Sequence, residues 1–341
     1  MKRVLALATL LSVVMTLTAC SGGTSSAGSA PAGSAGGQAA SASSQTAAVD
    51  WPKKTINFYC THASGGDTDY MARKLASSLE KVLGVSIAVT SVGGSNGATC
   101  TTQYKDGPTD GYTFICGNTA ALCGNKATKL VDFGYEAFEP VAIYGKQSGE
   151  NIVTRADAPY TNLKELIDAS KKKPNSIKFG ISTGGGVYIE SCVLKNLGGT
   201  QFNVVEAGDG ATRLTALLGG EIDCTSLPYS TAADYIKSGK LKSLCTVMSK
   251  APDLMPDQEC ASKYVPQLKI DTEYVILAPK NTNSALLKAM NDAILKVGQS
   301  DDWKKIVNSY CMQNPYVLNL QDTLSNLKEQ DNLYMSYQPY L

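Results

Sequence analysis

The 341-residue sequence has a single histidine, His62, and almost no excess charge of either sign. Lysine plus arginine total 31, against 30 aspartate plus glutamate. A chain this neutral lacks the basic surface that nucleic-acid binders use to neutralise phosphates, so we expect no nucleic-acid partner. With one imidazole, a multi-histidine metal site cannot form, and a Ser/His/Asp triad would depend on His62 alone. We therefore expect no metal, no cofactor and no catalytic residue.

Long apolar runs are missing beyond the N-terminus. The run from Val4 to Ala19 follows Lys2 and Arg3, and it is shorter than the roughly 20 residues that span a bilayer. It ends in Leu17-Thr18-Ala19-Cys20, which resembles a bacterial lipobox, where the cysteine is lipidated after cleavage. We predict that residues 1–19 form a lipoprotein signal peptide and that Cys20 carries the lipid, with an ordinary signal peptide as the alternative.

Residues 20–50 continue as a segment of mostly serine, alanine and glycine, which has no apolar face to bury. Such a composition behaves as a flexible coil, with a reach on the order of 30 Å at this length. We expect a lipidated cysteine and tether that hold a folded part, starting at Trp51, at the outer face of the cell membrane.

Cysteines are numerous but lack the spacing of a metal site. None of the nine beyond Cys20 forms a Cys-x-x-Cys pair, so a structural zinc is not expected. Nine thiols cannot all pair, and the sequence leaves their oxidation state open. Several lie in apolar runs and are expected to be small buried residues. They are Cys60, Cys100, Cys116, Cys123, Cys192, Cys224, Cys245, Cys260 and Cys311.

Strands and helices are expected to alternate along the folded part. The apolar spacing predicts strands at 55–60, 85–90, 112–116, 177–181, 202–206, 221–225, 241–248 and 274–278. It predicts helices at 163–172, 211–218, 230–238 and 321–334, and others with apolar faces at Met71, Leu75, Leu79 and Val82 and at Leu286, Met290, Ile294 and Val297. This order predicts an α/β fold with mainly parallel sheets, and the length favours two lobes.

Four loops that adjoin these strands are rich in Gly, Ser, Thr and Asn and contain no lysine or arginine. They are Thr61 to Asp69, Gly117 to Asn125, Ser182 to Tyr188 and Thr225 to Thr231. In such sheets, ligands bind beyond the carboxyl ends of the strands, where the first N–H groups of helices point outward. Backbone donors alone can hold an anion there, and plain turn chemistry is the alternative for each loop.

Nucleotide-binding motifs are incomplete in these loops. The turn Gly93 to Gly97 is not followed by Gly-Lys-Ser/Thr, and Gly184-x-Gly186 is followed by isoleucine at position 189. We expect His62 to contact a ligand and not to catalyse. Asp69 is expected to cap a helix, or alternatively to order the ligand loop or pair with an ammonium group on the ligand.

Together, short motifs from Trp51 to about Asn283 resemble the receptors of tripartite tricarboxylate transporters, also called Bug-type extracytoplasmic solute receptors. The matching segments are Trp51-Pro52 with Lys54 and Ile56, Gly65 to Arg73, Gly93 to Gly97, Asp110 to Thr113, Gly117 to Thr119, Phe138 to Ala142, Leu163 to Leu166, Leu217 to Asp223, Ser238 to Leu241 and Ala278-Pro279. The chain departs at Asp67, where the family typically has a small residue, and at Gln258 to Cys260.

The resemblance implies a type II periplasmic-binding-protein-like, Venus-flytrap fold with a mainly parallel sheet in each lobe. One lobe would comprise residues 51–152 and 272–341, the other residues 153–271. His62 stands where the family usually has an aromatic residue facing the ligand, and Tyr188 where it often has histidine. The expected ligand-binding residues are His62, Ala63, Ser64, Gly65, Gly66, Thr68, Asp69, Gly117, Asn118, Thr119, Thr183, Gly184, Gly185, Gly186, Tyr188, Ser226 and Tyr229.

The function that follows is an exported solute-binding lipoprotein. It would capture a small organic carboxylate and deliver it to a tripartite tricarboxylate-type transporter with one large and one small integral membrane subunit, without acting as an enzyme. A ligand-sensing receptor, or a binding protein of another transporter class for organic acids or amino acids, is the alternative. An exported hydrolase or transferase using a loop hydroxyl or a cysteine lacks a recognisable acid/base constellation.

Overall fold

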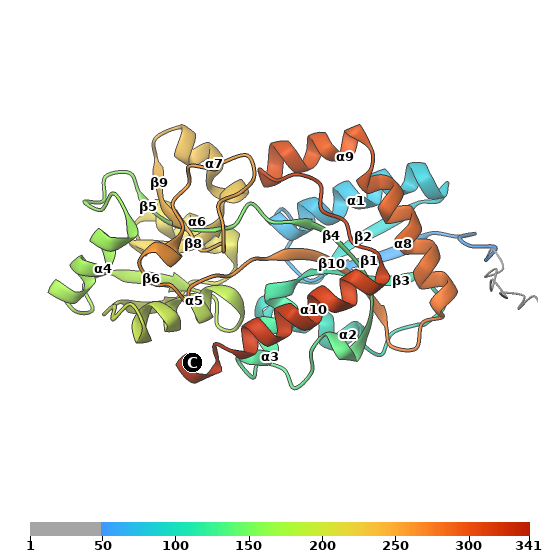
Figure 1. Cartoon of the computed structure of the whole chain (residues 1–341), viewed down its shortest axis with the longest axis horizontal. Helices are drawn as coiled ribbons and strands as arrows, with labels where there is room; N and C mark the ends of the chain where they lie inside the picture. The colour runs from blue at the N-terminus through green and yellow to red at the C-terminus, as the bar shows by residue number, and fades with distance from the viewer. Residues whose placement is uncertain (1–48) are drawn as a thin grey trace, which may run out of the picture. The chain divides into compact units, whose positions relative to one another are not determined.

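The computed structural model describes residues 49–341, so the expected signal peptide, Cys20 and most of the expected tether lie outside the described residues. Across that span, none of the helices has the length and apolar character needed to cross a bilayer. The chain forms two five-stranded sheets, each flanked by helices (Figure 1). The predicted α/β fold is therefore confirmed.

The first sheet has the strand order β2-β1-β3-β10-β4. Its strands are β2 (Ile87–Ser91), β1 (Ile56–Cys60), β3 (Thr113–Asn118), β10 (Glu273–Pro279) and β4 (Phe138–Lys146). Helices α1 (Asp67–Leu83) and α8 (Ser284–Gly298) share one buried cluster with one face of this sheet. Residues of α2 (Ala98–Tyr104) and α10 (Leu320–Met335) are buried in the cluster that includes the opposite face.

The second sheet has the order β7-β6-β8-β5-β9. Its strands are β7 (Asn203–Glu206), β6 (Lys178–Ile181), β8 (Cys224–Pro228), β5 (Glu150–Arg155) and β9 (Leu241–Thr246). Helices α4 (Leu163–Lys172) and α5 (Gly185–Asn196) contribute to the larger buried cluster, and α6 (Gly210–Gly219) and α7 (Tyr229–Lys237) to a smaller one. The short helices α3 (Asn125–Ala127) and α9 (Asp301–Ile306) belong to the segments around the first sheet.

One strand in each sheet runs against the rest. β10 is antiparallel to both β3 and β4, and β5 is antiparallel to both β8 and β9, so the other four strands of each sheet share one direction. The reversed strands are those with which the chain enters one sheet from the other, as the crossing segments in Figure 1 show. The prediction of mainly parallel sheets is confirmed, with a reversed strand at each crossing.

The predicted helical faces are buried in the structure. Met71, Leu75 and Leu79 of α1 are fully inaccessible to solvent and pack on the first sheet. The same holds for Met290 and Ile294 of α8. Burying such side chains contributes about 1.5–3 kcal/mol each, which fixes both helices on the sheet.

Three strands differ from the sequence-based expectation. β4 and β5 were not expected, because Pro140 and Gly145 weaken the strand pattern of the first and polar residues precede the second. β8 begins at Cys224, three residues later than expected. Glu221 and Ile222 instead donate their backbone N–H groups to the carbonyl of Ala216 and close the end of α6.

The nine cysteines of the described part are unpaired, and all but Cys192 and Cys260 are buried. Burial raises the pKa of Cys60 and of Cys100 to about 12. These two thiols are therefore protonated at neutral pH, and the thiolate, which is the reactive form, is scarce.

Candidate functional site

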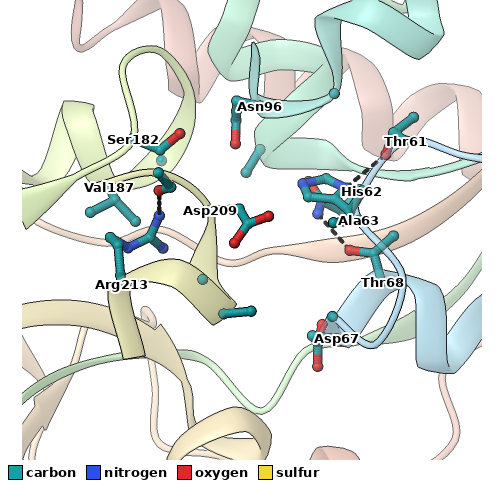
Figure 2. A pocket seen from close by; sticks show the side chains of 18 of the residues that line it. Thr61, His62, Ala63, Asp67, Thr68, Asn96, Ser182, Val187, Asp209 and Arg213 are labelled. Atoms are coloured by element: carbon teal, nitrogen blue, oxygen red, sulfur yellow. Dashed lines mark hydrogen bonds between the residues drawn. The ribbon is translucent and has the colours of Figure 1, made fainter. Parts of the chain in front are cut away.

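A cavity of about 650 Å³ lies where the carboxyl ends of strands from both sheets meet. The loops that line it follow β1, β2, β3, β6 and β7. Figure 2 shows His62 and Thr68 on one side of the cavity, with Asp209 and Arg213 on the opposite side. Residues attached to two separate sheets therefore face one common space.

The cavity brings together part of the expected ligand-binding set. The members that line it are His62, Ala63, Gly65, Gly66, Thr68, Asn118, Thr183, Gly184 and Gly186. The members outside its lining are Ser64, Asp69, Gly117, Thr119, Gly185, Tyr188, Ser226 and Tyr229. Contact of any of them with a ligand stays a prediction.

Several residues outside the lining support the cavity wall. The Asp69 carboxylate accepts hydrogen bonds from the Gly65 N–H at 3.0 Å and the Ser91 hydroxyl at 2.6 Å, and pairs with Arg73 at 3.0 Å. Burial alone would raise the pKa of Asp69, but these partners hold it below its usual value. Asp69 thus orders the loop, as one of the sequence-based alternatives proposed. Thr119 is fully buried and its hydroxyl accepts from the backbone N–H of Glu273.

The first-sheet wall is polar, and its side chains are bonded to one another. Asn118 donates to the Thr68 hydroxyl at 3.0 Å, and its carbonyl oxygen accepts from the Ala121 N–H at 2.8 Å. The His62 ring lies 2.8 Å from the Thr61 hydroxyl. Burial lowers the pKa of His62 to about 4, with Asp209 opposing that effect, so the imidazole is uncharged at pH 7.

Asp67 joins elements of both sheets at the first turn of α1. Its buried carboxylate accepts hydrogen bonds from Tyr274 at 2.7 Å, Gln147 at 2.8 Å and Ser230 at 2.7 Å. Tyr274 belongs to β10 of the first sheet, and Ser230 belongs to α7 beside the second. Burial raises the pKa of Asp67 above its usual value, although all three hydrogen bonds oppose this.

Charged residues line the second-sheet wall, where sequence reasoning had placed only neutral loops. Glu206 accepts from both the backbone and the hydroxyl of Thr183, at 2.7 and 2.5 Å. Asp209 caps α6 by accepting from the Thr212 N–H and hydroxyl, both at 3.0 Å. Arg213 is buried and donates to the backbone carbonyls of Gly208 at 2.8 Å and Ser226 at 3.2 Å.

Glu150, at the start of β5, also lines this wall. Its side chain has no hydrogen bond within residues 49–341, and Oε2 is buried without a partner. Burial raises the pKa of Glu150 to about 7, although Arg213 opposes the shift. Glu190 of α5 is fully buried with both carboxylate oxygens unpartnered, and burial raises its pKa far above the usual value.

The sequence held a signal for part of this charged wall. Gly208-Asp209-Gly210 follows an expected strand and precedes an expected helix. It therefore lies beyond the carboxyl end of a strand, as the four Gly-rich loops do, where ligands bind in such sheets. Arg213 stands one turn further along that helix. Glu150 offers no such signal, because its place at the cavity depends on the crossing between sheets.

Backbone N–H groups are available at two helix starts that border the cavity. α1 begins after Gly66 and α5 after Gly184, and neither N-cap has a side-chain hydrogen bond. The first N–H groups of a helix lack partners within it and favour anions. In the described part of the chain, no three His, Cys, Asp or Glu side chains cluster closely enough to hold a metal ion.

Comparison with known proteins adds the family to this geometry. The model of the tripartite tricarboxylate transporter family receptor matches residues 71–334. The chain belongs to the tripartite tricarboxylate transporter receptor family. It is therefore a solute-binding receptor of the extracytoplasmic type and not an enzyme.

Similar proteins match this chain over most of its length. BugT of Bordetella pertussis is 24% identical over 268 residues, covering 77% of this chain and 81% of BugT. The structure of Rpa4515 of R. palustris with adipate is similar at a TM-score of 0.78 and 20% identity, covering 85% of this chain and 98% of that one. MatC of Rhodopseudomonas palustris with bound malate has a TM-score of 0.75 at 19% identity, covering 84% of this chain and all of MatC. At these identities the solved structures show a shared fold.

Proposed function

We propose that this receptor is a lipid-anchored protein that captures a small organic carboxylate and delivers it to a membrane permease of one large and one small subunit. The observation that carries the proposal is the cavity itself, where two uncapped helix starts adjoin loops rich in Gly, Ser, Thr and Asn. A carboxylate can accept hydrogen bonds there from backbone N–H groups without a lysine or arginine.

Structural neighbours support this ligand class. Two of them hold a dicarboxylate, adipate in Rpa4515 and malate in MatC. Both share the fold of this chain. The cavity of this chain lies at the carboxyl ends of strands, where ligands bind in such sheets.

We further propose that the two sheets are the cores of two lobes that close around the ligand, with residues 51–152 and 272–341 forming one lobe and residues 153–271 the other. The Asp67–Ser230 hydrogen bond joins the two and is expected only in the closed arrangement. Saturating ligand should then reduce the radius of gyration in solution scattering. An unchanged radius with proven binding would contradict closure.

The binding proposal is tested with a panel of di-, tri- and aromatic carboxylates and amino acids in thermal unfolding. At a ligand concentration of 100 times Kd, binding stabilises the folded state by about 2.7 kcal/mol. For a domain of this size that raises Tm by roughly 5 to 10 °C. Shifts confined to sugars or metal cations, or stoichiometric conversion of a ligand, would contradict the proposal.

The anchor is tested separately with Cys20→Ser, which we expect to release the protein from membranes. Mass spectrometry of the wild-type N-terminus should find a lipid on Cys20. A variant that still fractionates with membranes, together with an unmodified wild-type cysteine, would contradict the anchor and leave the binding proposal standing.

A further inference from the structure

Most of the titratable side chains that line the cavity are carboxylates. Its wall includes Asp67, Glu150, Glu206 and Asp209, against the single guanidinium of Arg213, and it contains no lysine. A site that received only anions would place them among like charges, which costs free energy in a partly desolvated space. The balance of the wall therefore indicates that its ligand also carries positive charge.

Three of the four carboxylates already have structural partners. Asp67 accepts three hydrogen bonds, Glu206 binds Thr183, and Asp209 caps α6. Glu150 alone has no side-chain hydrogen bond in the described part of the molecule. A buried carboxylate oxygen without a partner destabilises the free protein, so a ligand donor at this position would supply the missing hydrogen bond.

A second acceptor lies close to Glu150 in the chain and also lines the cavity. The Gln147 side chain is 3% exposed, and its Nε2 donates to Asp67 at 2.8 Å. That bond uses the amide nitrogen of Gln147, so the amide oxygen needs a separate donor. The Gln147 Oε1 atom is left buried without a partner among the described residues.

Arg213 does not fill this deficit. Its two terminal nitrogens donate to backbone carbonyls, and no carboxylate of residues 49–341 pairs with it within 4.0 Å. Its Nε is buried without a partner among these residues, so it offers a further donor and no acceptor. Its role is to tie the loop at Gly208 to β8 through Ser226. The acceptors Glu150 and Gln147 thus remain open to a donor that the ligand supplies.

We infer that the ligand carries an ammonium group beside its carboxylate, and that Glu150 and Gln147 Oε1 accept hydrogen bonds from this ammonium. The inference rests on the proposed function, because the ligand carboxylate would occupy the starts of α1 and α5. An ammonium group has three donors and a full charge, which suits one carboxylate and one amide oxygen. The substrate class is an amino carboxylate and not a simple dicarboxylate.

The test uses ligand pairs that differ only in an amine, measured by isothermal titration calorimetry at pH 8 on protein freed of retained ligand. The pairs are L-aspartate and succinate, L-glutamate and glutarate, and 4-aminobutyrate and butyrate. We expect at least one aminated member to bind about ten-fold or more tightly than its partner.

Glu150→Gln should reduce affinity for that aminated ligand by about ten-fold or more and narrow the difference within the pair. Glu221→Gln, which removes an exposed carboxylate elsewhere in the second-sheet half, should leave both affinities unchanged. Thermal unfolding of each free variant verifies that it is folded before binding is compared.

The outcomes separate the two proposals. This inference would be overturned if succinate, glutarate or butyrate bound more tightly than the aminated member of its pair and Glu150→Gln left that difference in affinity unchanged. The proposal of a carboxylate receptor would still stand. Equal affinities within every pair would overturn the inference in the same way. Binding of no carboxylate, aminated or not, would overturn both.

Discussion

The two sides of the cavity treat their polar groups differently. On the first-sheet side, Asp67, Thr68 and Asn118 are joined by hydrogen bonds to other protein groups. On the second-sheet side, Glu150 and Glu190 have buried oxygens without partners in the described structure. Apart from the amide oxygen of Gln147, the first-sheet side is satisfied by hydrogen bonds within the protein, whereas the second-sheet side has carboxylate oxygens without partners.

This difference separates the side chains that stabilise the cavity from those that are free to bind a ligand. A buried carboxylate with three donors, such as Asp67, contributes to the folded structure, because removing it leaves those donors unpaired. An unpartnered carboxylate, such as Glu150, destabilises the free protein and is stabilised by a bound donor. The two groups should therefore respond in opposite ways to substitution.

The largest effect is expected from Asp67→Ala. The substitution removes the shared acceptor of Tyr274, Gln147 and Ser230, and we expect a loss of about 3 kcal/mol in the free energy of unfolding. Urea unfolding at pH 7 measures it. Asp67→Asn retains one acceptor oxygen and the size of the side chain, so its loss should be smaller. A cost below about 1 kcal/mol for alanine would remove the contrast between the two walls.

Glu150→Gln should change how stability depends on pH. The pKa of Glu150 in the folded state is raised from 4.5 to about 7, with Arg213, Asp67 and Glu190 as its charged neighbours. Protonated Glu150 makes its whole contribution to the free energy of unfolding below about pH 4.5, and this contribution is lost as pH rises through 7. The loss is at most about 3 kcal/mol.

The glutamine variant keeps an uncharged side chain at every pH, so it should lose less stability than the wild type between pH 5 and pH 8. Urea unfolding of ligand-free protein at both pH values measures the difference. Identical pH profiles for the two proteins would show that ionisation of Glu150 does not destabilise the fold. The second-sheet side would then not differ from the first-sheet side in this respect.

Gly185→Ala probes the place where the two walls touch. Gly185 has φ of +65°, and an added Cβ would lie 1.8 Å from Nδ2 of Asn96, which belongs to the first-sheet side. We expect a loss of about 2 kcal/mol from backbone strain and displacement of Asn96. The matched control is Gly186→Ala, whose Cβ would meet only Ala120 at 3.6 Å and whose stability should change by less than about 1 kcal/mol. Equal losses for both variants would contradict a specific contact at Gly185.

The smallest effect is expected from Ser230→Ala. It removes one of the three hydrogen bonds to Asp67 and should lower the free energy of unfolding by about 1 kcal/mol. Ser238→Ala, at the exposed end of the same helix, is the control and should change stability by less than about 0.5 kcal/mol. A loss as large as that of Asp67→Ala would mean that the Ser230–Asp67 hydrogen bond stabilises the fold more than the bonds from Tyr274 and Gln147 do.

Local patterns were sufficient to predict most of the fold. The helix 163–172 and the alternation of strands and helices follow from apolar spacing, which acts over a few residues. β4 and β5 escaped because they are defined by pairing with strands distant in the sequence, and β4 contains a proline and a glycine.

The candidate site divides along the same line. Gly-rich loops such as Ser182 to Gly186 could be predicted, since a turn after a strand is a local feature. The approach of Glu150, Glu190 and Arg213 to one another could not, because three separate elements bring them together. Glu150 and Arg213 line the wall, so the expectation that neutral loops alone form it is wrong.

The reversed strand β10 has a consequence for the order in which the two halves are built. It lies between β3 and β4, and β4 pairs with no other strand of the first sheet. All strands of the second sheet lie within residues 150–246, whereas the first sheet needs residues 273–279. During synthesis, which starts at the N-terminus, all strands of the second sheet are therefore available before β10 is made. Until then β3 and β4 lack the strand that pairs with both, and their apolar edges stay open. A chain ending at residue 272 should consequently retain a folded second sheet and expose a divided first one.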